Sequence, residues 1–475
     1  MNHTQFNNVH ETRAVQTLLH HALSHDFSSF LQYAFYTLNP SQPFISNWHL
    51  EAITEYLNAL ERCDIQRLII NMPPRSLKSL SSTVAWSAYL LGRNPAMRII
   101  TASYSSAISI KHATDVRSLV TSDWFSHIFP KFALHPSQNE KHKFMTTLQG
   151  FRLATSIGGS LTGEGGDLII IDDPLNPSQA MSRNSREATN HWFDHTLSSR
   201  LNDKRTGRML LVMQRLHSQD LSGHLLRKGG WEHLCLPAQA TTPMHVHIGN
   251  FSYHMDAKEL LQPQRETVDI LQQLRLDLGS AAYNAQYLQS PLADDGFMVK
   301  KAWCDFVYDT IPEEGILVQS WDTAIKTGYN NDFSACVTMK MHEGYYYVTD
   351  ITVLKAEYPE LKRMIKYHAT TMMPDAVLIE DKASGQSLLQ DLHNDSLPLI
   401  AIMPKDDKVT RFARISSQFE AGKLLFPVTA TWKDECINEL LQFPKGTHDD
   451  VVDALTQAVF WLMKKSVTTQ YMRQL

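Results

Sequence analysis

The sequence predicts an α/β protein with two successive α/β units. Before residue 240, four short runs are continuously apolar, which is typical of strands in a parallel sheet covered by helices on both faces. Helical patterns separate these runs, so the first unit has the βαβ rhythm of a doubly wound nucleotide-binding domain. The four predicted strands are 66–72, 97–104, 167–173 and 208–214.

A second α/β unit begins near residue 313. A predicted strand starts at 316 and leads into a hairpin at 334–354, whose turn is the His-Glu-Gly tripeptide. A helix and the strand 375–381 follow. Because the intervening stretch carries few strand signals, we predict three parts: a first domain at 1–240, a connecting region at 241–312 and a second domain at 313–475.

Composition narrows the class of protein. The chain has 43% hydrophobic and 20% charged residues with a formal net charge of -5, so any DNA contact must come from a local basic patch. The N-terminus lacks a signal-peptide pattern, and no apolar run reaches the ~18 residues needed to cross a bilayer. We therefore expect a soluble protein of a reducing cytosol. The cysteines form no C-x-x-C pair, which indicates neither a disulfide framework nor a zinc site: Cys63, Cys235, Cys304, Cys336 and Cys436.

The first predicted strand runs into the loop MPPRSLKS and then a helix. A strand, a loop with Lys-Ser and a helix are the parts of a phosphate-binding P-loop, in which Lys78 reaches the outer phosphates and Ser79 ligates Mg²⁺. Arg75 adds a second charge for phosphate, and Ser76 belongs to the same cradle. Met72 and Leu77 stand where the usual pattern has glycine, so the loop should be less free to adopt positive φ. Alone, the motif is equally consistent with a solvated turn.

The predicted strand 167–173 ends in two carboxylates, as a Walker B element does. In such an element the first acid, here Asp172, orders the magnesium shell, and the second, Asp173, activates the attacking water. The second acid is more often glutamate. By itself the segment is also consistent with an ordinary Asp-Asp-Pro turn, but the order of the two motifs favours an ATPase site.

Three further acids follow strand or helix boundaries in the second unit. Asp322 and Glu380 each end a predicted strand, and Asp450 opens an amphipathic C-terminal helix. Carboxylates from separate elements that converge on two Mg²⁺ or Mn²⁺ ions are the requirement of an RNase H-like nuclease. Asp449 is an alternative ligand beside Asp450, and Asp453 can share the same helix face. The bland alternatives are strand-end residues and acids that favour a helix N-terminus.

Two groups of basic residues leave their roles open. Lys405, Lys408, Arg411 and Arg414 fit either a groove for a DNA backbone or a solvated helix. Arg200, Arg205 and Arg208 are candidates for an arginine finger, within one subunit or between neighbours. Asp332 is a further acid that we place in a loop of the second unit.

Several ordered segments resemble the large terminase family of tailed bacteriophages. NMPPRSLKS is similar to that family's Walker A variant, and GGSLTGEGGDLIIIDDP is similar to its Walker B region. LVMQRLHSQDLSGHLL resembles its coupling motif, with Gln214 and Arg215 as the matching residues. WHLEAI at 48–53 resembles the adenine-contacting segment, and LGSAAYNAQYLQSPLADDGFMVKKAW resembles the region between ATPase and nuclease. The acids at Asp322, Glu380 and Asp450 match the nuclease motifs in order.

The resemblance implies a P-loop ATPase followed by an RNase H-like nuclease. It implies ATP and Mg²⁺ as cofactors, with Mn²⁺ as an alternative nuclease metal, and double-stranded DNA as substrate. It also implies a portal protein, a small terminase subunit and a homo-oligomeric ring as partners, in the cytoplasm of a bacterial host and not in the mature virion. Two alternatives are a cellular helicase-nuclease, which would need a second RecA-like domain, and a catalytically decayed capsid-assembly or DNA-binding protein.

Overall fold

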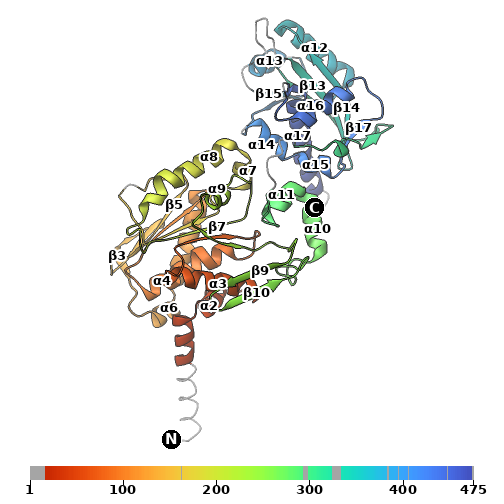
Figure 1. Cartoon of the computed structure of the whole chain (residues 1–475). Helices are drawn as coiled ribbons and strands as arrows, with labels where there is room; N and C mark the ends of the chain where they lie inside the picture. Colours follow the sequence, from red (N-terminus) through yellow and green to blue (C-terminus); the bar gives the residue numbers. More distant parts are fainter. Residues whose placement is uncertain are drawn as a thin grey trace, which may run out of the picture. The chain divides into compact units, whose positions relative to one another are not determined.

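The computed structural model describes residues 16–161, 163–291, 298–323, 333–381, 384–393, 395–404, 406–446 and 448–472. The chain divides into two compact units, the first formed by Met1–Leu271 with Ala281–Ala293 and the second by Gln272–Ser280 with Asp294–Leu475. Figure 1 shows both. The predicted connecting region 241–312 is thus divided between the two units. Asp332 and Lys405 lie outside the described residues.

The first unit contains an eight-stranded sheet in the order β3-β4-β5-β2-β6-β7-β1-β8. The six strands from β5 to β8 in that order are parallel, while β3 and β4 add antiparallel pairings at one edge. The four predicted strands are all present, and the parallel α/β fold is confirmed. The strands are β1 (Arg67–Asn71), β2 (Arg98–Ser103), β3 (Leu134–Asn139), β4 (Lys143–Thr146), β5 (Phe151–Ser156), β6 (Leu168–Asp172), β7 (Arg208–Met213) and β8 (Glu232–Cys235).

Helices cover both faces of this sheet because successive strand residues enter opposite cores. Leu68 and Ile70 of β1 pack into one cluster, beneath α2 to α5, whereas Ile69 packs into the other, beneath α8, η2 and α9. The helices are α2 (Phe27–Leu38), α3 (Trp48–Glu61), η1 (Leu80–Ala85), α4 (Trp86–Arg93), α5 (Ser106–Val120), α6 (Asp123–Ile128), α7 (Pro177–Met181), α8 (Arg183–Trp192), η2 (Phe193–Leu197), η3 (Ser198–Arg200) and α9 (Leu221–Lys228).

Residues after 240 add a small hairpin to the first unit. Strands β9 (Met244–Ile248) and β10 (Phe251–Met255) pair antiparallel, and Val246 and Met255 are buried in the same cluster as α3. Helices α10 (Val268–Leu278) and α11 (Ser280–Gln286) follow. The hairpin is therefore part of the first unit's core.

The second unit is built on a seven-stranded mixed sheet in the order β11-β17-β14-β13-β12-β15-β16. The predicted hairpin is the antiparallel pair β13–β14, and Glu343 and Gly344 take positive φ in its turn. The strands are β11 (Val307–Tyr308), β12 (Ile316–Asp322), β13 (Ser334–His342), β14 (Tyr345–Leu354), β15 (Ala376–Glu380), β16 (Leu399–Ile402) and β17 (Leu424–Pro427).

Two helical layers flank this second sheet. One core joins the sheet to α14, α15, α16 and α17, and the other joins Trp321, Val377 and Ile379 to α12 and α13. The helices are η4 (Lys301–Trp303), α12 (Tyr358–Met372), α13 (Ser384–Leu392), α14 (Lys408–Ala413), α15 (Ser416–Glu420), α16 (Lys433–Gln442) and α17 (Asp450–Met472). All five cysteines are free thiols. Among the described residues, no helix is both long enough and apolar enough to span a bilayer.

Candidate nucleotide and metal sites

The first candidate site lies at the carboxyl ends of three neighbouring parallel strands. In the sheet β7 lies between β6 and β1, and the register pairs Asp172 with Val212 and Asn71 with Met213. The loop after β1, the acids at the end of β6 and Gln214 after β7 therefore meet at one edge. This is the edge of a parallel sheet at which ligands bind in open α/β folds.

The loop after β1 adopts a left-handed backbone at two residues that are not glycine. The φ angle is 63° at Arg75 and 62° at Leu77. We expected leucine to restrict this conformation, yet the loop adopts it, although a left-handed residue costs roughly 1–2 kcal/mol. The Leu77 side chain packs against the core cluster beneath α3 and α4, and that burial offsets the cost. Packing thus replaces the conformational freedom of glycine.

Lys78 and Ser79 contact the two acids at the end of β6. The Lys78 Nζ lies 2.8 Å from Asp173 Oδ2, and the Ser79 hydroxyl donates a hydrogen bond of 3.0 Å to Asp172 Oδ1. Burial raises the pKa of both carboxyl groups, and the Lys78 charge opposes that shift. The structure thus brings together four of the predicted site residues, which lie ~93 positions apart in sequence.

The other predicted residues of this loop differ in exposure. Arg75 is exposed at the loop surface, whereas Ser76 is buried beside the ring of His49. Burial lowers the pKa of His49 to about 4, so its imidazole is neutral at pH 7. Trp48, the neighbour of His49 in the segment that resembles an adenine contact, stacks on Tyr253 with ring centroids 3.9 Å apart. The segment 48–53 forms the first turns of α3.

Two residues behind Asp172 were missed from the sequence. His112 on α5 has its Nδ1 3.5 Å from Asp172 Oδ2, and burial lowers its pKa to about 4, with the Arg152 charge as the next cause. Arg152 on β5 is 1% exposed, and within the described residues its guanidinium nitrogens have no hydrogen-bond partner. Burial lowers the pKa of Arg152 to about 9, while Asp172 raises it. The one sequence signal was an arginine inside an apolar strand.

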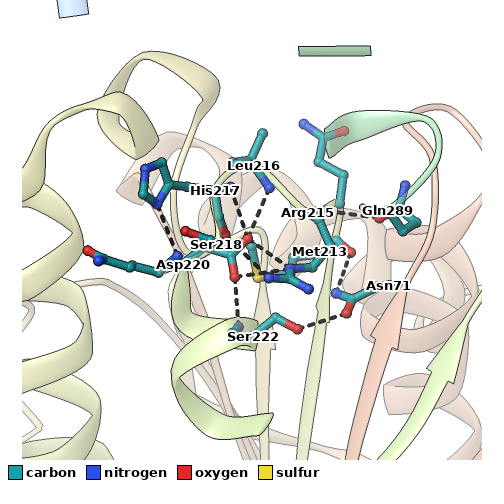
Figure 2. A network of polar contacts seen from close by, with 12 residues as sticks. Asn71, Met213, Arg215, Leu216, His217, Ser218, Asp220, Ser222 and Gln289 are labelled. Atoms are coloured by element: carbon teal, nitrogen blue, oxygen red, sulfur yellow. Dashed lines mark hydrogen bonds and ion pairs between the residues drawn. The ribbon is translucent and has the colours of Figure 1, made fainter. Parts of the chain in front are cut away.

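The predicted coupling residues form a buried polar network (Figure 2). The Gln214 backbone N–H donates to Asp173 Oδ1 at 3.4 Å, and the Arg215 backbone N–H donates to Gln289 Oε1 at 2.9 Å. The Arg215 side chain lies 3.0 Å from an oxygen of Asp220, which is fully buried. The adjacent backbone N–H groups that follow β7 thus contact Asp173 on one side and the 281–291 segment on the other.

Asp220 has a second task as the cap of α9. Its carboxylate accepts hydrogen bonds from the backbone N–H groups of Leu216, His217 and Gly223. Ser222, in the first turn of α9, donates at 2.7 Å to Asn71 at the end of β1. The network therefore fixes α9 to the strand that carries the phosphate-binding loop (Figure 2).

The arginine-finger candidates lie away from Lys78. Arg208 opens β7 and donates to the Glu61 carbonyl at 3.0 Å, at the strand end opposite the acids. Arg200 donates to the backbone carbonyls of Thr196 and Leu161. Arg205 has a side chain that is 91% exposed. In the described structure, no member of the set forms an ion pair with Asp172 or Asp173.

The second candidate site forms at strand ends in the second unit. Because β12 and β15 are parallel and Trp321 pairs with Ile379, Asp322 and Glu380 end neighbouring strands at the same edge. Helix α17 begins at Asp450 and packs on β12 and β13. The Gln457 side chain donates to Ser320 at 3.1 Å inside the core, which holds the helix over β12.

The acids of α17 face the strand-end acids. Burial, together with the nearby charges of Asp453, Glu380 and Asp450, raises the pKa of Asp322 to about 7, while the charge of Lys408 opposes the shift. Burial also raises the pKa of Asp453, whose side chain is 5% exposed. Asp453 therefore lies in the interior of the cluster, a position that the helix periodicity allowed but did not require. Asp449 lies at the rim, with a side chain that is 38% exposed.

Two basic residues of α14 contact this cluster. Lys408 Nζ lies 2.7 Å from Asp449 and 2.6 Å from Asp453, while Arg411 lies 3.1 Å from Asp453 and 3.4 Å from Glu380. These ion pairs differ from the solvated helix that the sequence left open for the two residues, and their role in a groove for DNA stays a prediction. Arg414, by contrast, pairs with Asp406 at 2.8 Å.

The donor sets fit the groups that each site is expected to hold. In the first unit, the carboxylate of Asp172 keeps one buried oxygen without a hydrogen bond and lies beside the Ser79 hydroxyl, which suits an octahedral Mg²⁺ shell at a nucleotide. In the second, carboxylate oxygens from two strands and one helix suit hard divalent ions. Among the described residues, no three His, Cys, Asp or Glu side chains are grouped closely enough to hold a metal ion. Lys408 and Arg411 form ion pairs with the acids instead.

Comparisons with known proteins concern the fold of both units. Residues 319–461 match the family model described as the terminase RNaseH-like domain. The large terminase of a thermophilic bacteriophage, solved in complex with ADP, matches at 11% identity and a TM-score of 0.51, covering 87% of this chain and 98% of that one. The same phage terminase in complex with ATP-gamma-S matches at 10% identity with a TM-score of 0.52 and the same coverage.

A third solved structure is the magnesium-bound large terminase nuclease of the thermophilic phage G20c, at 15% identity and a TM-score of 0.25, covering 32% of this chain and 83% of that one. No curated protein matches the sequence. The likeness to the nucleotide-bound terminase extends over both units and shows the fold, and the family model covers the sheet and helix that carry the second acid cluster. The chain thus has the fold of a phage large terminase, and its residues 319–461 match the family model of the terminase RNaseH-like domain.

Proposed function

We propose that this protein is the large terminase subunit of a tailed bacteriophage or prophage. It hydrolyses ATP to drive duplex DNA into a procapsid, and it cuts concatemeric DNA with a two-metal nuclease. One observation carries the proposal: a single chain holds a Lys-Ser loop on two Walker-type acids in one unit and a terminase-type acid cluster in the other. A helicase-nuclease or a decayed protein gains no support from any described feature.

In the ATPase site, Lys78 and Arg75 bind the phosphates, and Ser76 and Ser79 complete the cradle. Mg²⁺, when bound with ATP, neutralises charge that develops on the transferred phosphoryl group. Asp172 holds the position of that ion through its contact with Ser79, and Asp173 orients the attacking water. On ATP binding, the Lys78 ammonium exchanges its contact with Asp173 for the outer phosphates, which releases that carboxylate for the water.

In the nuclease site, Asp322, Glu380 and Asp450 are the principal acids, and Asp449 is a further ligand. Two divalent ions, when bound, stabilise the attacking and leaving oxygens of the scissile phosphate. The chain's own contribution is to hold carboxylates from β12, β15 and α17 at one point, since each comes from a rigid element.

The partners follow from the same proposal. We infer an ATPase domain at 1–240, a connecting region at 241–312 and a nuclease domain at 313–475. The motor assembles as a homo-oligomeric ring on the portal protein, receives DNA through a small terminase subunit and works in the host cytoplasm. An exposed arginine such as Arg205 then reaches a neighbouring subunit's nucleotide more easily than its own.

The test is cleavage of supercoiled plasmid with Mg²⁺ or Mn²⁺, together with phosphate release from ATP. The variants are Asp322→Ala and Lys78→Ala, each a control for the other because they lie in different compact units. Cutting that needs metal, disappears in Asp322→Ala and persists in Lys78→Ala supports the nuclease assignment. ATP hydrolysis should show the reverse pattern.

Three results would overturn the proposal. Undiminished cutting by Asp322→Ala removes the nuclease site, and undiminished hydrolysis by Lys78→Ala removes the ATPase site. ATP-driven unwinding of a tailed duplex without capsid or portal indicates a helicase instead. A packaging reaction with procapsids, portal and wild-type protein completes the comparison, because a terminase should protect DNA from added nuclease only in that mixture.

A further inference from the structure

Helix α14 carries two basic side chains that contact the acid cluster of the second unit. Asp407 caps its start by accepting from the Thr410 backbone N–H at 2.9 Å, and Phe412 is fully buried in the core beneath α17. Lys408 and Arg411 are three residues apart and so share one helix face. The Asp407 cap and Phe412 therefore anchor the backbone of α14, and the two long side chains extend from it to the acids.

The contacts of Lys408 and Arg411 link acids from three elements. Lys408 joins Asp449 and Asp453, at 2.7 and 2.6 Å, and Arg411 joins Asp453 and Glu380, at 3.1 and 3.4 Å. Glu380 and Asp449 are among the proposed metal ligands, and Asp453 lies between the two cations. The two side chains therefore neutralise two of the carboxylates that the metal ions require, and they share the interior Asp453 beside them.

Burial separates the two partners of the Lys408–Asp453 pair, whereas the Arg411 side chain is itself only 15% exposed. The Asp453 side chain is 5% exposed, so an unpaired charge there is costly and a counter-cation is needed in every state. The Lys408 side chain is 46% exposed, so its ammonium can leave for solvent at small cost. A buried Asp453 paired with an exposed Lys408 is the arrangement expected where a metal ion can take the place of the lysine charge.

We propose that Lys408 and Arg411 are positioning residues that hold the nuclease acids in ion pairs before metal binds and withdraw when divalent ions enter. This inference rests on the proposed nuclease function. The metal then neutralises the cluster in place of the two side chains, so metal binding and cation withdrawal are one exchange. Lys408, the more exposed of the two, leaves first.

The exchange is tested by calorimetric titration of the full-length protein with Mn²⁺ in the absence of nucleotide. Lys408→Gln removes the competing charge, so the dissociation constant for Mn²⁺ should fall roughly threefold to tenfold below wild type. Lys408→Arg retains the charge and should bind like wild type. Lys362→Gln is the matched control, because it breaks a lysine–aspartate pair of 3.2 Å elsewhere in the same unit.

Thermal unfolding gives a second readout that does not depend on cleavage. In chelator, Lys408→Gln should unfold about 2–4 °C below wild type, because Asp453 loses a counter-charge. Saturating Mn²⁺ should abolish that difference, since the metal replaces the lost cation. A lysine with only a structural role predicts the same deficit with and without metal, which would overturn the proposal. Arg411→Gln provides an independent variant, with an effect in the same direction.

The failure of this inference is distinguishable from failure of the nuclease assignment. If Asp322→Ala leaves the Mn²⁺ isotherm unchanged, the metal site itself is misplaced. If Asp322→Ala abolishes binding while Lys408→Gln binds Mn²⁺ as wild type does, or more weakly, the nuclease site stands and the exchange is wrong.

Discussion

Each unit has a buried acid in an ion pair, but the cations of the two pairs differ in their exposure. In the first, Asp220 is fully buried and pairs with Arg215, whose side chain is 11% exposed. In the second, Asp453 is equally interior, yet one of its partners, Lys408, is 46% exposed. Both partners of the first ion pair are buried or nearly so, whereas the cation of the second pair is exposed to solvent.

This difference matches what each unit has to bind. Under the proposed function, the edge that carries Lys78 must attract an anion, while Arg215 is paired with the buried Asp220. The edge that carries Asp322 and Glu380 must attract cations, so its acids require counter-charges that can be displaced. Of the two pairs compared, the one with the more exposed cation is the one that we propose to be exchangeable.

The largest effect is expected from breaking the closed pair. Asp220→Ala leaves the Arg215 charge buried without its partner and removes the cap of α9, so the free energy of unfolding should fall by about 3–5 kcal/mol. Urea denaturation followed by fluorescence measures it, with Asp391→Ala, an exposed member of a lysine pair in the other unit, as the control. A loss of less than about 1 kcal/mol would place this pair with the exchangeable ones.

A change of comparable size is expected in catalysis at Asp173. Asp173→Asn keeps the shape but loses the charge that orients water, so kcat for ATP should fall roughly 10²–10³-fold. Asp173→Glu should retain measurable hydrolysis, because glutamate is the more common residue at such positions. Phosphate release measures both variants, and the metal-dependent plasmid cutting of each should equal wild type. Equal loss in the two variants would show that geometry matters more than charge here.

A smaller effect is expected from pH at the nuclease site. Burial raises the pKa of Asp322 to about 7, so below that pH the metal-free protein holds a proton that a divalent ion must displace. Affinity for Mn²⁺ should therefore rise up to about tenfold between pH 6 and pH 7 and level off above pH 8. Titrations at these three pH values measure it. An affinity that does not change with pH would mean that Asp322 is already ionised.

The same proton has a consequence for stability with the opposite sign. The pKa of Asp322 is higher in the folded state than its ordinary value, so the folded metal-free protein binds this proton more tightly than the unfolded chain does. The resulting stabilisation is present at low pH and is lost as the pH rises toward about 7. Bound metal reverses the preference, because it favours the ionised carboxylate.

The sequence predicted the parts of each site that depend on local pattern. Asp172, Asp322 and Glu380 each end an apolar run. Because the carboxyl ends of parallel strands share an edge of the sheet, Asp322 and Glu380 meet in the second unit, and Asp172 lies beside the end of β7 in the first. Arg152 and His112 could not be predicted to lie near Asp172, because their side chains approach it across strands and a helix distant in sequence. A single sequence does not show how segments that are distant along the chain pack against each other.

Side-chain direction was the second limit of the sequence. The sequence indicates that Lys408 and Arg411 share a basic helix face. Only the packing of α14 on α17 shows that this face contacts Asp453. Asp453 shared a face with Asp450 by helix period, but the period does not say which of them is interior. In the first unit, Leu77 shows the reverse case, where packing overrides a backbone preference that the sequence made plain.

The smallest stability change is expected at Arg75, and it separates backbone strain from ligand contact. Arg75→Gly relieves a left-handed residue, worth roughly 1–2 kcal/mol, but glycine adds entropy to the unfolded chain worth roughly 0.5–1 kcal/mol. Because Arg75 is exposed and loses little packing, the unfolding free energy should change by less than about 1 kcal/mol. The KM for ATP should nevertheless rise about tenfold through the lost phosphate contact. Arg75→Lys keeps a charge and should fall between the two. If the glycine variant binds ATP as wild type does, Lys78 alone supplies the cationic side of the site, and the contrast between an anion-binding edge and a cation-binding edge rests on a single residue.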